Sequence, residues 1–145
     1  MKIRNILATK KGHLITVRDD EPVRRAIAVL VEHRIGALLV VDENGKLVGI
    51  LSERDIMRTA AGDENFFGRP VAEIMTRDVI VGMPQDDIIA VAQTMLEKRF
   101  RHLPIVDEGQ LIGIISIGDV LKIQRDAYRG EVDTLETRII AEGEE

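Results

Sequence analysis

The chain contains no cysteine, and this absence excludes several kinds of chemistry. Without thiols there are no disulfides, no zinc–thiolate sites and no cysteine nucleophile. Aromatic residues are also scarce, with no tryptophan, one tyrosine and three phenylalanines among 145 residues. Hydrophobic residues nevertheless make up 45% of the chain, which is ordinary for a globular protein. We therefore expect a core built from aliphatic side chains.

Long hydrophobic runs and an excess of positive charge are missing as well. No run approaches the roughly 18 apolar residues that a membrane-spanning helix needs. The first residues, MKIRNILATKKGH, include no apolar stretch of signal-peptide length. The net charge is −5, whereas a general nucleic-acid-binding surface is basic. These absences predict a soluble cytoplasmic protein that binds neither membranes nor nucleic acid.

Sequence patterns typical of enzymes are absent too. The chain has no Gly-x-Ser-x-Gly nucleophile elbow, no Gly-x-Gly-x-x-Gly and no phosphate-binding P-loop. Its three histidines show no metal-ligand spacing. We therefore expect neither catalytic activity nor a requirement for a metal.

The chain does contain an internal repeat. The segment GILSERDIMR recurs 64 residues later as GIISIGDVLK. Ser52 and Asp55 in the first segment correspond to Ser116 and Asp119 in the second. The spacing indicates that the chain is built from two copies of one unit, and that each copy carries the same Ser-x-x-Asp turn.

Hydrophobic patterns predict the order β-α-β-β-α in each copy. In the first copy, a β-type run at 14–17 precedes Pro22, where acidic residues and a proline mark the start of an amphipathic helix. The continuous apolar run at 36–41 is typical of a buried strand. An Asn-Gly turn follows, and a return strand ends at Ser52, where a second helix begins.

The second copy repeats this order, with predicted strands over 79–81, 103–106 and 111–115. A short lead-in is repeated as well, because Ile3–Leu7 resembles Val71–Met75. One copy has too little core to fold alone. We therefore expect an α/β protein in which two β-α-β-β-α repeats are related by pseudo-two-fold symmetry and pack their sheets together.

Four segments are expected along the chain. The first repeat with its lead-in occupies 1–62, a linker 63–70, and the second repeat 71–122. Residues 123–145 form a predicted C-terminal amphipathic helix and tail, whose apolar stripe consists of Ile123, Ala127, Val132, Leu135 and Ile139. Such a stripe has to be covered, either by its own domain or by a partner.

The repeated Ser-x-x-Asp turn allows two interpretations. A serine at the end of a strand and an acid three residues later are typical of a capping box at the start of a helix, although that box usually has Glu or Gln as its acid. Alternatively, a carboxylate at a helix N-terminus can accept hydrogen bonds from the two hydroxyls of a ribose, while the helix amides bind a phosphate. Both interpretations stay open from the sequence.

The pattern Gly-x-apolar-apolar-Ser-x-x-Asp, preceded by an apolar strand that ends in Asp, resembles the CBS domain, named after cystathionine β-synthase. Such domains occur as tandem pairs, called Bateman modules, and the resemblance covers about residues 3–122. The segments IGALLVVDENGKLVGILSERDI and RFRHLPIVDEGQLIGIISIGDV are especially similar to small bacterial proteins that consist of a single CBS pair.

The resemblance implies a regulatory, energy- or redox-sensing module that binds an adenosine-containing ligand in clefts between its repeats. AMP, ADP, ATP, NAD(H) and S-adenosylmethionine are the ligands it allows, with AMP or NAD(H) preferred. It also implies that two modules pair into a homodimer, and that an unknown protein is regulated. A module with empty clefts that only binds other proteins is the alternative.

The resemblance also implies which residues bind the ligand. Asp55 and Asp119 are expected to hold a ribose, with Ser52 and Ser116 beside them. The strand and lead-in residues expected to line the adenine are Thr16, Thr76 and Ile80.

The two copies differ where a phosphate is expected. Arg54 in the first turn is replaced by Gly118 in the second, and Arg101 and His102 begin a strand in the second repeat only. In the family, each cleft combines the turn of one repeat with strands of the other. We therefore expect the three cations to converge on the cleft of the first turn, and the cleft of the second turn to hold few cations.

Overall fold

A computed structural model describes residues 1–10 and 14–128 of the chain. Its elements, in chain order, are α1 (Ile3–Thr9), β1 (Thr16–Arg18), α2 (Val23–His33), β2 (Ala37–Val41), β3 (Leu47–Ser52), α3 (Glu53–Ala60), α4 (Ile88–Lys98), β4 (His102–Asp107), β5 (Gln110–Ser116) and α5 (Ile117–Ala127), with two short 3₁₀ turns at Phe66–Gly68 and Val71–Glu73. Within these described ranges, no helix has the length and apolar character that crossing a membrane requires. Of the predicted C-terminal stripe, Val132, Leu135 and Ile139 lie outside the described residues.

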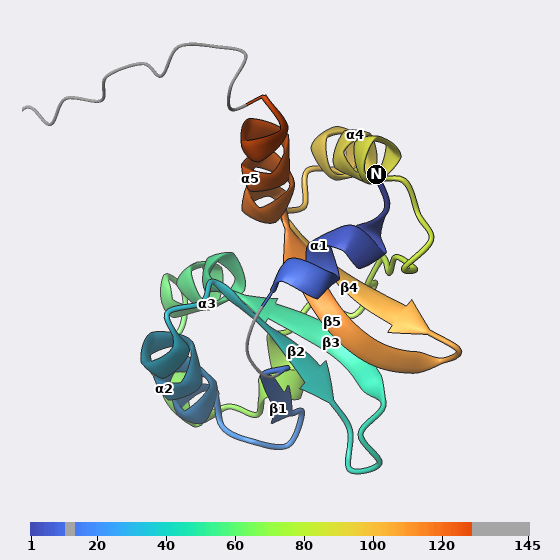
Figure 1. The fold of residues 1–145 in the computed structure, drawn as a ribbon. Coiled ribbons are helices and arrows are strands. Elements are labelled where there is room, and N and C mark those ends of the chain that lie inside the picture. The colour runs from blue at the N-terminus through green and yellow to red at the C-terminus, as the bar shows by residue number, and fades with distance from the viewer. Residues whose placement is uncertain (11–13, 129–145) are drawn as a thin grey trace, which may run out of the picture.

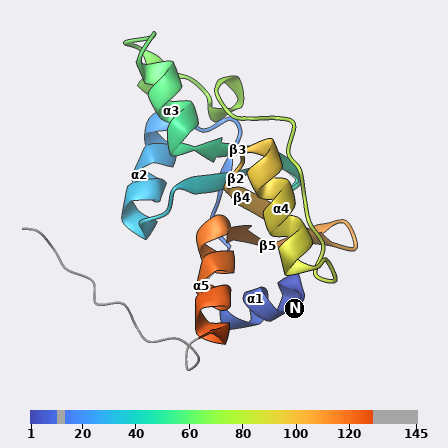
Figure 2. The same cartoon turned by 90° about the horizontal axis from the view of Figure 1, so that it is seen from above.

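The strands form two sheets, one in each repeat (Figure 1). In the first sheet β1 runs parallel to β2, and β2 runs antiparallel to β3. In the second sheet β4 and β5 are antiparallel. The helices α2 and α3 accompany the first sheet, while α4 and α5 accompany the second (Figures 1 and 2). The predicted α/β fold with two related repeats is confirmed.

The predicted strand at 79–81 does not form, and the second sheet lacks the parallel strand that β1 supplies in the first. Instead, Gly82 alone bridges β4, donating its N–H to Pro104 O at 2.9 Å and accepting from Val106 N at 2.8 Å. In the first repeat the ladder continues because Asp19 N donates to Val41 O at 3.0 Å. Pro84 holds the corresponding position in the second repeat and has no N–H to donate.

Each lead-in is buried in the core of the other repeat. Ile3 and Ile6 of α1 are 0% and 1% exposed, and they belong to the cluster that includes Met95, Ile105 and Ile115 of the second repeat. Both views show α1 beside α5 (Figures 1 and 2). The two repeats are therefore joined by exchanged segments as well as by the linker.

The second lead-in makes the reciprocal contact with the first repeat. Val71 and Met75 belong to the cluster that includes Val17, Leu38 and Leu51. Their burial means that the second lead-in completes the core of the repeat that precedes it. Since each core takes side chains from both halves of the chain, neither repeat has a complete core of its own.

The glycine of each repeated motif makes room for the lead-in that crosses it. A Cβ atom at Gly49 would lie 2.6 Å from Met75 Sδ and 2.9 Å from Thr76 O, while one at Gly113 would lie 2.8 Å from Leu7 Cδ2. Beside Gly49, the backbones of Ile50 and Thr76 exchange hydrogen bonds of 3.0 and 2.9 Å. The glycine therefore fixes how closely the lead-in can approach β3.

Gly49→Ala is expected to lower the free energy of unfolding by about 1–3 kcal/mol, because its Cβ meets a backbone oxygen that cannot turn aside. Gly113→Ala is expected to cost less, since the obstacle is the flexible end of Leu7. Gly62→Ala is the control, because its Cβ would meet nothing within 4 Å. Urea denaturation followed by circular dichroism compares the three. A Gly49→Ala protein as stable as the Gly62→Ala protein would contradict this account.

Candidate functional site: two clefts between the repeats

Two clefts open between the repeats, one at each Ser-x-x-Asp turn. We call them the Asp55 cleft and the Asp119 cleft, and their volumes are about 440 and 530 Å³. Both volumes lie within the range that holds a small-molecule ligand. Each cleft is lined by both repeats: Arg101 of the second repeat reaches the Asp55 cleft, and Leu39 of the first reaches the Asp119 cleft.

Both Ser-x-x-Asp turns form capping boxes, which confirms the first interpretation of this motif. Ser52 N donates to Asp55 Oδ2 at 3.0 Å, and Asp55 N donates to Ser52 Oγ at 3.2 Å. Ser116 and Asp119 make the same pair of hydrogen bonds at 2.8 and 3.1 Å. In both boxes the backbone N–H of the serine is bonded to Oδ2. The cap therefore leaves Oδ1 of each aspartate available for other donors.

Asp55 is a buried carboxylate surrounded by donors from two segments. The residue is only 6% exposed. Thr76 of the second lead-in donates its hydroxyl to Oδ1 at 3.2 Å, and Arg58 Nη1 lies 3.6 Å from the same oxygen. Because the Thr76 hydroxyl is neutral and the Arg58 side chain is mostly exposed, no buried cation is bonded to this carboxylate within the described part of the chain.

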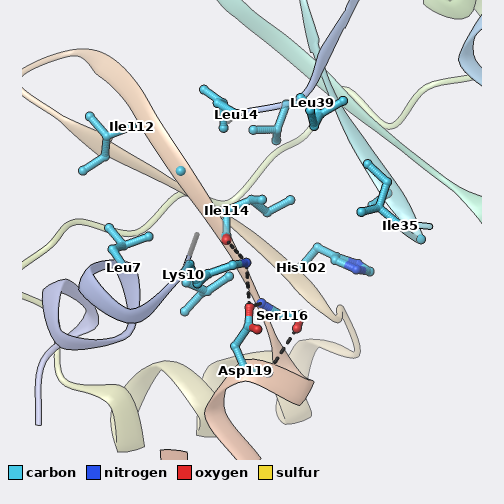
Figure 3. Close-up of a pocket in the computed structure, with 15 residues that line it drawn as sticks. Leu7, Lys10, Leu14, Ile35, Leu39, His102, Ile112, Ile114, Ser116 and Asp119 are labelled. Carbon is cyan, nitrogen blue, oxygen red and sulfur yellow. Dashed lines mark hydrogen bonds and ion pairs between the residues drawn. The ribbon is translucent and has the colours of Figure 1, made fainter. Parts of the chain in front are cut away.

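Asp119 has a different partner, the ammonium group of Lys10. Lys10 Nζ donates to Asp119 Oδ2 at 2.9 Å and to Ile114 O at 2.7 Å (Figure 3). Burial raises the pKa of the Asp119 carboxyl, but the hydrogen bonds from Lys10 and Ser116 outweigh it and hold the pKa below its ordinary value of 3.8. The expectation of an Asp119 cleft with few cations overlooked this lysine. Lys10 reaches the cleft because the lead-ins are exchanged.

The Asp119 cleft separates polar groups from apolar ones. Figure 3 shows the Lys10 ammonium, Ser116 and Asp119 gathered where α5 begins. The remaining wall is mostly aliphatic, and its side chains include Leu7, Leu14, Ile15, Ile35, Leu39 and Ile112. Such a lining suits a ligand with a flat apolar part and a polar, hydrogen-bonding part.

The three predicted phosphate ligands lie together in one cleft. Arg54, Arg101 and His102 all line the Asp55 cleft, along with Ser52 and Thr76. Two further arginines that the sequence analysis did not single out, Arg58 and Arg99, line the same cleft. The Asp55 cleft therefore carries four arginines against two acids, Glu53 and the buried Asp55.

Two predicted adenine-lining residues are not among the described residues that line either cleft. Thr16 pairs with Leu39 in the first sheet, and its neighbour Ile15 reaches the Asp119 cleft instead. Ile80 lines a separate hollow beside α4. Because side chains of an extended chain alternate in direction, the choice between Ile15 and Thr16 depends on one residue of register.

Histidine 102 lies on the wall that the two clefts share. His102 lines both clefts, as does Gly36. Burial lowers the pKa of His102 below 6.5, and the positive charges of Lys10 and Arg101 lower it further, while Asp119 and Glu53 act in the opposite direction. The imidazole is therefore mainly neutral at pH 7, when no ligand is present.

The lowered pKa of His102 predicts how stability depends on pH. Between pH 6.5 and the lower folded-state pKa, the unfolded chain binds more protons, so the free energy of unfolding falls as the pH falls through this window. His102→Gln should flatten this dependence. His33→Gln, which replaces an exposed histidine, is the control and should leave the dependence unchanged. Urea denaturation at several pH values from 5 to 8 measures the slope. A His102→Gln protein that keeps the wild-type slope would refute the assignment.

Metal ligands are not gathered anywhere in the described part of the chain: no group of three or more His, Asp or Glu side chains there is close enough to hold an ion.

The comparison with known protein families agrees with the two repeats found in the sequence. The model of the CBS domain family matches residues 3–62 and 71–126. The CBS domain-containing protein YhcV of Bacillus subtilis is 32% identical over 112 residues, which are 77% of this chain and 79% of that protein. A relative from Methanocaldococcus jannaschii is 34% identical over 113 residues, but the chain spans only 39% of its length.

Solved structures agree with this match. A CBS-domain-containing protein from Agrobacterium tumefaciens has a TM-score of 0.81 and 34% identity, covering 85% of this chain and 92% of that one. CBSX2, solved in complex with AMP, has a TM-score of 0.76 and 29% identity, covering 88% and 98% of the two chains. The CBS domain pair of protein MJ0100, solved with 5′-methylthioadenosine and S-adenosyl-L-methionine, has a TM-score of 0.78 and 28% identity, with the same coverage of 88% and 98%.

Proposed function

Because the chain belongs to the CBS domain family, we propose that it is a regulatory module that binds an adenine nucleotide in the clefts between its two repeats. The observation that carries this proposal is the pair of clefts, each with a carboxylate held at the start of a helix. The complexes of CBSX2 with AMP and of MJ0100 with adenosine derivatives support it. The chemistry is binding followed by a change of shape, with no covalent step.

The Asp55 cleft suits the ribose and phosphate of a nucleotide. Oδ1 of Asp55 accepts from a ribose hydroxyl in place of the Thr76 hydroxyl that it now binds. Arg54, Arg101 and His102 line the same cleft and donate charge-assisted hydrogen bonds to the phosphate. AMP, ADP, ATP and the adenosine half of NAD(H) share these groups, and AMP is the smallest of them. In the absence of a nucleotide, the Thr76 hydroxyl therefore donates the hydrogen bond to Asp55 Oδ1 that a ribose hydroxyl would otherwise donate.

Replacing the two aspartates tests the proposal. Asp55→Ala and Asp119→Ala are each expected to weaken AMP binding at one cleft by about tenfold to a hundredfold, because a charge-assisted hydrogen bond contributes roughly 1.5–3 kcal/mol. Isothermal titration calorimetry with AMP measures the affinity. Asp126→Ala removes the same charge from a residue that lines neither cleft. If both cleft variants fold and bind AMP as the Asp126→Ala protein does, the carboxylates serve only as caps.

The helix surfaces support our further proposal that two copies form a two-fold symmetric homodimer, the commonest closed assembly. Each of the four helices beside the sheets carries a large exposed apolar side chain: Val31 on α2, Met57 on α3, Leu96 on α4 and Leu121 on α5. Val31 and Met57 also line one hollow between α2 and α3. A monomer would leave these side chains in water.

A charged substitution distinguishes a residue of the dimer interface from one that is only exposed to solvent. At low micromolar concentration the protein should sediment at twice 16.2 kDa. Leu96→Glu is expected to give a folded monomer, because a charge buried in an apolar interface lacks a partner. Met83→Glu, at another exposed apolar position that lies outside the helices, should remain a dimer. A wild-type protein that is monomeric with and without AMP would overturn the assembly proposal.

A further inference from the structure

We propose that Lys10 makes the Asp119 cleft selective for adenosine ligands that carry an anionic group next to the ribose, such as a 5′-phosphate. This inference rests on the proposed function and concerns which adenosine ligands the second cleft accepts. The two clefts share the Ser-x-x-Asp turn, and they differ in the group that the exchanged lead-in brings to the carboxylate.

The first step is the occupancy of the carboxylate oxygens. In the Asp119 cleft, Oδ2 already accepts from Ser116 N and from Lys10 Nζ. A ribose diol that approaches Asp119 therefore finds only Oδ1 without a bond inside the described part of the chain. In the Asp55 cleft, Oδ2 accepts from Ser52 N and Ser52 Oγ, and a diol has to displace the Thr76 hydroxyl from Oδ1. The two carboxylates therefore differ in the charge of the group that shares them, which is a neutral hydroxyl at Asp55 and an ammonium at Asp119.

The second step concerns the charge of the Asp119 cleft. Asp119 and Lys10 are the only acid and the only permanently charged base among the described residues that line it. A phosphate entering without Lys10 would meet the uncompensated charge of Asp119 in a largely aliphatic cleft, where charge repulsion is strong. With Lys10 in place the pair carries no net charge, so a phosphate that binds on the Lys10 side meets the ammonium without uncompensated repulsion from Asp119.

The third step concerns the N–H donor of Lys10 that is not bonded to Asp119 or Ile114. A lysine ammonium has three N–H donors, and the structure shows two of them bound to Asp119 and Ile114. The Lys10 side chain is 39% exposed and lines the cleft, so its remaining donor is accessible to a ligand. His102 lines the same cleft, and a phosphate beside it favours its protonated form. The anion therefore gains one permanent cation and one inducible cation.

The experiment isolates the Asp119 cleft and changes only the lysine. Asp55→Ala weakens the first cleft, and in this background we compare Lys10 with Lys10→Met by calorimetric titration with AMP, adenosine and 5′-methylthioadenosine. Lys10→Met should weaken AMP binding by about tenfold to a hundredfold, since one charge-assisted contact is lost. Binding of the two neutral ligands should stay the same or become tighter, because Asp119 Oδ2 is released for the ribose.

Three further variants control for charge and for folding. Lys46→Met removes the same charge from an exposed residue of the first hairpin and should leave all three affinities unchanged. Lys10→Arg should keep the preference for AMP, because the cation is retained. If Lys10→Met fails to fold, Lys10→Gln supplies the same comparison with a neutral side chain.

The outcomes separate this inference from the proposed function. If the unsubstituted protein binds none of the three ligands, the proposed function fails. If it binds AMP but the Asp55→Ala protein does not, the Asp119 cleft accepts no anionic adenosine ligand and the inference about Lys10 is overturned. The same conclusion follows if Lys10→Met changes the affinities for AMP and adenosine by equal factors, or changes neither.

Discussion

The structure depends on the burial of each lead-in in the core of the opposite repeat. Ile3 and Ile6 complete the second core, and Val71 and Met75 complete the first. This exchange requires a close backbone approach at the repeated glycines. It also brings Thr76 to Asp55 and Lys10 to Asp119. The packing that holds the repeats together therefore decides which donor faces each carboxylate, so that the stability of the fold and the polar chemistry of the clefts have the same structural origin.

The Ser-x-x-Asp turn can serve the fold and a ligand together, because a carboxylate has more acceptor sites than the cap uses. The cap binds Oδ2 in both repeats. The remaining capacity is satisfied by the neutral Thr76 hydroxyl in one cleft, whereas in the other the ammonium of Lys10 shares Oδ2 with the cap. An aspartate held in this way is already placed and partly desolvated, which reduces the entropy lost when a ligand is bound.

Local patterns in the sequence predicted the repeats, the helix starts at Ser52 and Ser116, and the α/β fold, because these depend on neighbouring residues. They did not predict the loss of the strand at 79–81, because the parallel ladder lacks an N–H at Pro104 of β4 on one side of Gly82 and at Pro84 on the other. Lys10 was missed because its partner Asp119 is 109 residues away.

The exchanged lead-ins also set the order in which the molecule can be assembled during synthesis. The segment that contains Ile3 and Ile6 is synthesised before its partners, which extend from Ile88 to Val120. The first repeat, by contrast, can close as soon as residues 71–75 have emerged. Contacts between distant residues slow folding, because a large loop must be closed before they form. Helix α1 therefore has no complete core to pack against until the second repeat has been synthesised.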